Sequence, residues 1–155
     1  MSAESVLEWL AAHAPDLALI DHNRSTATVA EAAEVLGVEP GRIAKTLAFR
    51  VGDTPMLLVA RGDARLDNAR CKAELGGRPR MLDPEETLAL TGHAVGSVCP
   101  FGLASALPIL CDRSLLFYPS VFPAAGSRTS SIEVEPARLA ELTGGRWVEI
   151  CKLPE

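Results

Sequence analysis

Residues 45–60 read KTLAFRVGDTPMLLVA and have the pattern of a β-hairpin. In residues 45–51 apolar side chains recur at every second position, at Leu47, Phe49 and Val51. This is the period of a strand with one buried face. Gly52-Asp53 supplies the turn, and residues 55–60 return as an apolar run typical of a mostly buried strand. We therefore expect two adjacent antiparallel strands in the sheet.

Outward from this hairpin, short helices and short strands interleave. Thr28-Val29-Ala30-Glu31 matches a capping box, and Gly37 is placed to end the helix that it starts. Asp83-Pro84 starts another helix, which ends at Gly92. Further helices are expected over residues 4–13, 68–75 and 136–142, and strands or extended segments over 17–21, 78–82, 107–111, 115–124, 132–134 and 146–151.

This order lacks the regular strand–helix alternation of a doubly wound parallel sheet. We therefore expect an α+β fold, with a mixed sheet curled toward a barrel and surrounded by helices. The 155 residues contain no repeat or linker, so residues 1–155 are expected to form a single domain.

Composition excludes several classes of protein. A hydrophobic content of 48 % suffices for a core. A net charge of −5 argues against a protein whose whole surface binds nucleic acid non-specifically. A local basic patch for RNA stays open, whereas neither DNA nor a membrane is expected as a partner. No apolar run is long enough to span a bilayer, and the first residues lack the pattern of a secretory signal. We predict a cytoplasmic protein.

The four cysteines, Cys71, Cys99, Cys111 and Cys151, form no C-x-x-C pair, and no histidine lies at zinc-finger spacing. We expect reduced thiols and no bound metal. Cys71 and Cys111 have the setting of small buried apolar residues. Cys99 has two interpretations, a small residue that fits its loop or a nucleophile, and no histidine is evidently placed to activate it.

Cys99 lies in a glycine- and proline-rich stretch, Gly96-Ser97-Val98-Cys99-Pro100-Phe101-Gly102. Glycine lets the backbone approach a ligand closely, and proline stiffens the path. Such a loop can direct several N–H groups at an anion or a polarised carbonyl. It can equally be a tight turn between buried strands.

Lys45 is unusual because it starts an apolar strand, and burying an ammonium there without a partner has an unfavourable free energy. It can also reach solvent at the strand end. No G-x-S-x-G elbow, phosphate-binding loop or dinucleotide fingerprint accompanies it. His13, His22 and His93 stand in unrelated settings, and no carboxylate cluster suggests a metal or a cofactor.

Three elements together resemble the YbaK family. They are Ala44-Lys45-Thr46-Leu47, the Gly96-x-x-x-Pro100-x-Gly102 loop, and Ala125-Gly126-Ser127-Arg128 followed by Ile132-Glu133-Val134. The family comprises Cys-tRNA(Pro) deacylases and the editing domain inserted in bacterial prolyl-tRNA synthetases, and the similarity runs over residues 28–142. The resemblance implies a mixed α+β, barrel-like domain without a cofactor.

The resemblance also implies a function, the hydrolysis of the ester that joins a wrong, small amino acid to tRNA, with tRNA(Pro) as the expected acceptor and prolyl-tRNA synthetase as a possible partner. A synthetase pocket discriminates weakly between similar side chains, so a second, hydrolytic site must remove errors. The lysine that matches Lys45 is the essential catalytic residue of the family. The implied substrate-binding residues are Thr46, Gly96, Ser97, Val98, Cys99, Pro100, Gly102, Ser127 and Ser131.

Three departures from the cysteine-specific members leave the amino acid open. Ser131 stands where those members have aspartate, Ser127 replaces a lysine, and Cys99 replaces a serine. Alanine, serine, threonine and other small amino acids are therefore alternatives to cysteine. The rival functions are a non-catalytic module that binds tRNA or a synthetase, a thiol enzyme using Cys99, and a small-molecule domain. The basic residues considered for RNA contact are Arg24, Arg42, Arg61, Arg65, Arg70 and Lys72.

Overall fold

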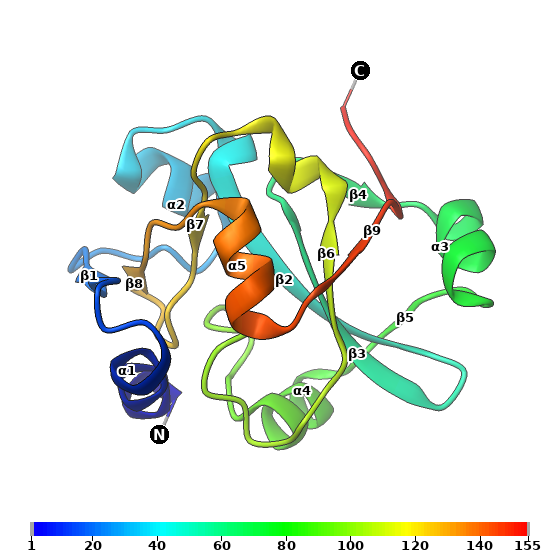
Figure 1. The fold of residues 1–155 in the computed structure, drawn as a ribbon, viewed down its shortest axis with the longest axis horizontal. Coiled ribbons are helices and arrows are strands. Elements are labelled where there is room, and N and C mark those ends of the chain that lie inside the picture. Colours follow the sequence, from blue (N-terminus) through cyan, green and yellow to red (C-terminus); the bar gives the residue numbers. More distant parts are fainter. Residues whose placement is uncertain (1, 155) are drawn as a thin grey trace.

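The computed structural model describes residues 2–154 and has a mixed sheet at its centre with helices packed around it (Figure 1). The helices are α1 (Ser2–His13), α2 (Val29–Leu36), α3 (Asn68–Leu75), α4 (Pro84–Thr91) and α5 (Pro136–Thr143), with short 3₁₀ segments η1 (Pro40–Arg42) and η2 (Arg113–Phe117). The strands are β1 (Ile20–Asp21), β2 (Ile43–Val51), β3 (Thr54–Arg61), β4 (Arg65–Leu66), β5 (Arg80–Met81), β6 (Ile109–Asp112), β7 (Phe122–Pro123), β8 (Ser130–Ser131), β9 (Arg146–Val148) and β10 (Cys151–Lys152).

The predicted hairpin is confirmed as the longest pairing of the sheet. Strands β2 and β3 pair antiparallel without a bulge, from Ala44 opposite Arg61 to Val51 opposite Thr54. The strand order is β5-β2-β3-β6-β9, and β7 also pairs with β2. The β3–β6, β6–β9 and β2–β7 pairs are parallel, so the sheet is mixed as expected.

The expectation that the sheet curls toward a barrel is wrong. The sheet stays open, because the described strands on its two edges do not pair with each other. The edge strands β5, β7 and β9 have only two or three residues. Closure into a barrel needs a continuous staggered ladder around the whole circumference, and strands this short cannot supply it.

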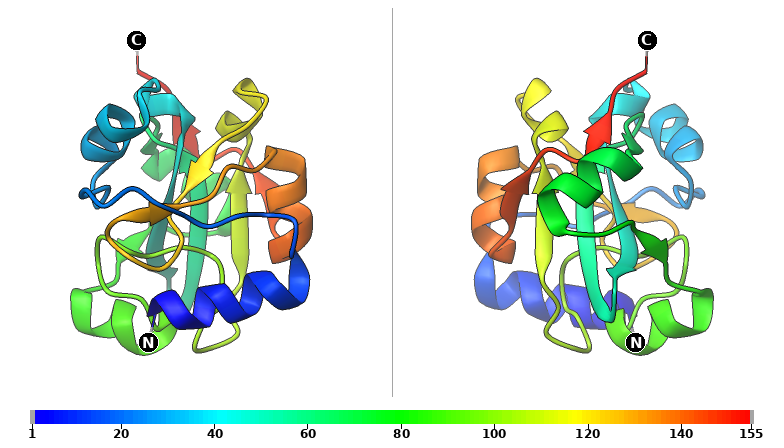
Figure 2. Two further views of the ribbon diagram at one scale, coloured as in Figure 1. Left: turned by 90° about the vertical axis from the view of Figure 1, so that its left-hand side faces the viewer. Right: turned by 90° about the vertical axis from the view of Figure 1, so that its right-hand side faces the viewer.

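Successive side chains of β2 and β3 point to opposite faces of the sheet, so the core is divided into one cluster on each face. On one face, Phe49 and Leu58 pack with Cys71 of α3 and with Ile150 near the C-terminus. On the other face, Ala44, Val59 and Cys111 belong to the cluster that contains Val6, Leu10 and Leu139 from α1 and α5. Figure 2 shows α1 lying crosswise at the end of the strands, with α4 at the same end.

Local sequence signals are confirmed at the helix ends. Thr28 and Glu31 form the capping box of α2, and Gly37 ends it in the left-handed conformation. Asp83 caps α4 by accepting from the N–H of Glu86. The expected extended segment over 115–124 is corrected in its first part: Asp112 accepts from the N–H of Ser114 and caps the 3₁₀ turn η2, so only Phe122–Pro123 pair as a strand.

All four cysteines are buried and unpaired in the described chain. Within residues 2–154, the helices fall short of the length and apolar character that a bilayer crossing requires.

Candidate active site

A gap in the pairing of β2 creates the site. On the edge away from β3, β7 pairs with Ile43 and Ala44, and β5 pairs with Phe49 and Arg50. The N–H of Leu82 donates to the carbonyl of Ala48 at this edge. Since alternate residues of a strand direct their backbone groups to the same edge, the N–H and C=O of Thr46 face the gap between the two short strands.

A cavity of about 410 Å³ lies at this gap. Its polar lining residues are Thr26, Thr28, Lys45, Thr46, Thr87, Ser130 and Ser131. Its apolar lining residues include Val29, Ala32, Leu36, Ile43, Leu47, Met81, Leu82, Val95, Val98 and Phe122. The described lining contains neither a histidine or cysteine nor a carboxylate, so Lys45 is its one ionisable side chain. An apolar cleft with a few polar groups is the usual form of a small-ligand site.

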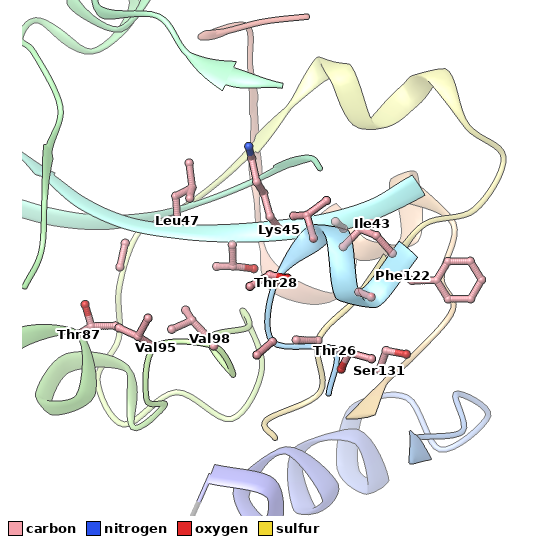
Figure 3. A pocket seen from close by; sticks show the side chains of 18 of the residues that line it. Thr26, Thr28, Ile43, Lys45, Leu47, Thr87, Val95, Val98, Phe122 and Ser131 are labelled. Atoms are coloured by element: carbon pink, nitrogen blue, oxygen red, sulfur yellow. The ribbon is translucent and has the colours of Figure 1, made fainter. Parts of the chain in front are cut away.

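Lys45 lies in the wall of this cavity, but its amine does not point toward the glycine-rich loop. Figure 3 shows the Nζ atom on the opposite side of β2 from Val95 and Val98. There the amine donates to the carbonyl oxygen of Ala64. Burial lowers the pKa of Lys45 from its ordinary value of 10.5, while Cys151 and Asp63 act in the opposite direction. Lys45 and Gly96 thus both line the cavity, while the Lys45 amine points away from it across β2.

Thr46 carries the one buried side-chain oxygen or nitrogen of the described chain that lacks a hydrogen-bond partner, its Oγ1 atom. A buried hydroxyl without a partner destabilises a protein by about 1–3 kcal/mol, so natural proteins keep few of them. Thr46 lines the cavity, where the backbone groups of the gap can meet a ligand, whereas its unpaired hydroxyl is itself buried.

The glycine-rich loop contributes Gly96 and Val98 to the cavity, but not Ser97, Cys99, Pro100 or Gly102. Gly96 has φ +94°, which favours glycine. Gly102 has a packing role, since a Cβ there would lie 2.7 Å from the backbone of Ser5 in α1.

Cys99 is fully buried in the core, where desolvation raises the pKa of its thiol to about 12. Its Sγ lies 3.6 Å from Nε2 of His93, a proximity that the sequence did not reveal. The Nε2–H of His93 donates to the carbonyl of Phe101 at 2.7 Å, and burial lowers the pKa of His93. This pair lies in the core, and neither residue lines the cavity.

The loop over residues 125–131 brings Ser131 to the cavity, and Ser131 shares a 2.7 Å hydrogen bond with Nε2 of His22. Ser127 does not line the cavity, and its hydroxyl shares a 2.6 Å hydrogen bond with that of Ser130, which does. Arg128 donates from Nη1 to the carbonyl of Val95, at 2.8 Å. This contact joins the loop to the glycine-rich stretch.

Sequence reasoning missed several lining residues, among them Thr26, Thr28 and Thr87. The capping box at Thr28 was a usable signal, because it placed a helix start near the polar stretch His22–Ser25. Nothing in the sequence indicated that α2 would pack over β2. No group of three or more histidine, cysteine, aspartate or glutamate side chains within residues 2–154 is arranged to hold a metal ion.

The chain is similar to a known family and to several bacterial proteins. Residues 23–142 match the family described as the aminoacyl-tRNA editing domain. YwhH of Bacillus subtilis (strain 168), a protein described as uncharacterised, is 48 % identical over 130 residues, which cover 83 % of each chain. EbsC of Enterococcus faecalis, a proposed Cys-tRNA(Pro)/Cys-tRNA(Cys) deacylase, is 33 % identical over 76 % of this chain and 73 % of its own length.

Larger proteins and solved structures extend the likeness. A proline–tRNA ligase of Thermotoga maritima is 38 % identical over 77 residues, which make up 13 % of that enzyme. A crystal structure of a proposed trans-editing enzyme for prolyl-tRNA synthetase superposes with a TM-score of 0.89 at 34 % identity, covering 97 % of both chains. The likeness to this structure extends over nearly the whole fold.

Proposed function

The chain belongs to the family of aminoacyl-tRNA editing domains, and from this premise we propose that it is a trans-editing deacylase. It hydrolyses the ester that joins a small, wrong amino acid to a mischarged tRNA. The tRNA is tRNA(Pro), and the protein acts in the cytoplasm. The relatives described as a proposed Cys-tRNA(Pro) deacylase and a proposed trans-editing enzyme support the acceptor. The relation to proline–tRNA ligases supports prolyl-tRNA synthetase as a partner.

The observation that carries the proposal is the lining of the cavity, in which Lys45 is the one ionisable group of the described residues and Thr46 has a buried hydroxyl without a partner. Ester hydrolysis builds negative charge on the carbonyl oxygen, which a nearby ammonium or N–H group stabilises. The Lys45 ammonium has three N–H donors, and Ala64 occupies one of them. Because the amine lies across β2 from Val95 and Val98, the proposal requires it to turn from the Ala64 carbonyl toward the cavity, where its donors anchor and polarise the substrate.

The hydrolytic step needs no covalent intermediate with the protein. The oxygen of a water molecule attacks the ester carbonyl carbon. The bond from that carbon to the ribose oxygen then breaks, one proton of the attacking water passes to the ribose oxygen, and the amino acid leaves with a free carboxyl group. If a nucleophile on the substrate attacks first, the acyl product that it forms must be hydrolysed by water in a second step. The absence of histidine, cysteine and carboxylate from the described lining supports this route over a protein nucleophile. Gly96, Val98 and Ser131 line the space for the aminoacyl group.

The size of the cavity supports a small side chain, since about 410 Å³ must hold the amino acid together with part of the ribose. The lining hydroxyls of Ser130, Ser131 and Thr26 are compatible with alanine, serine or threonine as well as cysteine. Cysteine specificity has less support, because Ser131 stands where the cysteine-specific members carry aspartate.

The alternative is a non-catalytic module of the same fold that binds tRNA or a synthetase. A deacylation screen over tRNA(Pro) charged with alanine, cysteine, serine or threonine, run with the wild type and Lys45→Ala in parallel, separates the two. The proposal requires turnover by the wild type and its loss in the variant. Binding of tRNA without turnover of any ester would support the alternative.

A further inference from the structure

Arg128 connects three segments that line the cavity. Its Nη1 donates to the carbonyl of Val95 at 2.8 Å, and its own carbonyl accepts from the N–H of Thr26 at 2.7 Å. Its guanidinium lies against Gly96, where a Cβ would be only 2.9 Å from the Cζ of Arg128. Val95, Gly96 and Thr26 are all lining residues, so Arg128, which does not itself line the cavity, lies directly beside it.

Most of the donor capacity of Arg128 is unused. Its side chain is exposed, and Val95 accepts the one side-chain hydrogen bond recorded for it in the described chain. A guanidinium has five N–H donors. Arg42, Arg50 and Arg61 are each paired with a carboxylate, whereas no carboxylate of residues 2–154 lies within ion-pair distance of Arg128. In a chain of net charge −5, this is an exposed cation without a carboxylate partner beside the site.

The charges of an aminoacyl-tRNA decide which part of it can meet this cation. The carboxylate of the amino acid is consumed in the ester, and its amino group is cationic near neutral pH. The anions of the substrate are therefore its phosphodiesters, which a guanidinium binds through paired N–H groups. Arg128 must face the nucleotide part of the substrate, and the aminoacyl group must point inward toward Thr46 and Val98.

We propose that Arg128 binds the phosphate of the 3′-terminal nucleotide of the substrate while it holds the Gly96 turn in place. One edge of the guanidinium keeps its bond to Val95, and the other edge takes the phosphate. The inference rests on the proposed function, because it assumes an aminoacylated nucleotide in this cavity. It deepens that function by fixing the direction in which the substrate enters.

The test compares two amide analogues that cannot be hydrolysed, 3′-alanylamino-3′-deoxyadenosine with and without a 5′-phosphate. Dissociation constants are measured by calorimetry for the wild type, Arg128→Ala, Arg128→Lys and Arg146→Ala. Arg146 is the matched control, an exposed arginine on β9 at the opposite edge of the sheet. Thermal unfolding of each variant shows whether the fold is kept.

In the wild type and in Arg146→Ala, the 5′-phosphate should lower the dissociation constant about tenfold. This is the lower end of the range expected for hydrogen bonds to a charged group, because the site is exposed. Arg128→Ala should lose this gain. Arg128→Lys should keep part of the gain through its charge, but should lower kcat with any active tRNA ester, because lysine cannot hold Val95 and a phosphate together.

Several outcomes would overturn the inference. They are an unchanged phosphate gain in Arg128→Ala, no phosphate gain in the wild type, and no measurable binding of the phosphorylated analogue. A purely structural role would weaken both analogues equally and would also contradict it. Failure of the proposed function is a separate result, because deacylation of tRNA esters tests that function. The effect of the 5′-phosphate is measured by binding alone, so it can be present or absent in a protein that hydrolyses no tRNA ester.

Discussion

Lys45 donates its amine to the carbonyl oxygen of Ala64, on the side of β2 opposite Val98 (Figure 3). We predict that Lys45→Ala keeps the fold and loses deacylation by about 100-fold or more, the size expected for removing a group that stabilises an oxyanion. Stability should change little, because the loss of the hydrogen bond to the carbonyl of the buried Ala64 offsets the removal of a partly buried ammonium. Single-turnover deacylation and thermal unfolding measure the two effects.

Lys152→Ala is the control for this variant, since Lys152 is an exposed lysine on β10. It should retain full activity. Wild-type turnover by Lys45→Ala would contradict the role given to the lysine.

A second prediction concerns Gly96, which has φ +94° and lies against the guanidinium of Arg128. Gly96→Ala introduces a Cβ into this contact and strains the backbone, so stability should fall by about 1–3 kcal/mol. Deacylation should fall as well, because the turn lines the cavity. Gly37→Ala is the matched control: Gly37 also has a positive φ, +69°, but open space surrounds it, so its strain should leave activity intact.

A third prediction uses the unpaired Oγ1 of Thr46. Thr46→Val keeps the shape of the side chain and removes a buried hydroxyl without a partner, so stability should rise by about 1 kcal/mol. If that hydroxyl binds substrate, kcat/KM should fall in the same variant. Urea unfolding and deacylation kinetics measure the two opposite changes.

The control for Thr46 is Thr91→Val. The hydroxyl of Thr91 is buried and fully used, donating to the carbonyl of Thr87 at 2.6 Å and accepting from the N–H of His93 at 3.0 Å. Its removal should destabilise the protein by about 1–3 kcal/mol. A loss of stability of that size in Thr46→Val would show that its hydroxyl has a partner after all.

The parts of the fold that could be predicted from the sequence are those fixed by local chemistry. The capping residues Thr28 and Asp83 determined helix starts, and the alternation of Leu47 and Phe49 determined a strand. The open edge could not be predicted in this way. It depends on β5 and β7, which have two residues each and therefore leave no period in the sequence.

The candidate site residues came from a resemblance in sequence order rather than from local chemistry. Of those residues, Lys45, Thr46, Gly96, Val98 and Ser131 line the cavity, and the roles given to them stay predictions. The direction of the Lys45 amine depends on the carbonyl of Ala64, which comes from another turn of the chain. In the glycine-rich loop, Val98 meets the cavity while the next residue, Cys99, enters the core. Motif matching cannot separate two such neighbours.

A fourth prediction follows from the burial of Cys99. At neutral pH, iodoacetamide should leave Cys99 unmodified in the folded protein, because the reactive thiolate is scarce when the pKa is raised to about 12. Mass spectrometry after digestion measures the modification, and the urea-unfolded chain, in which the same thiol should react, is the control. Rapid labelling of Cys99 together with loss of deacylation would instead favour a thiol enzyme.

The last prediction concerns acid stability and the buried His93. Its Nε2–H donates to the carbonyl of Phe101, and its Nδ1 lies 2.5 Å from the hydroxyl of Ser2. Burial lowers the pKa of His93 in the folded state from its ordinary value of 6.5. Below pH 6.5 the unfolded chain therefore binds a proton that the native state resists, so the unfolding free energy falls as the pH drops.

His93→Gln tests this sign directly. At pH 7 the variant should be less stable by about 1–3 kcal/mol, because it disturbs a buried hydrogen-bonded group. Between pH 7 and pH 5 its stability should change less than that of the wild type, since the group that resists protonation is gone. Urea unfolding at pH 5, 6 and 7 measures both the unfolding free energy at pH 7 and its change with pH. His13→Gln, which changes an exposed histidine, should keep the wild-type slope. An equal slope in His93→Gln and the wild type would mean that carboxylates alone cause the loss of stability in acid.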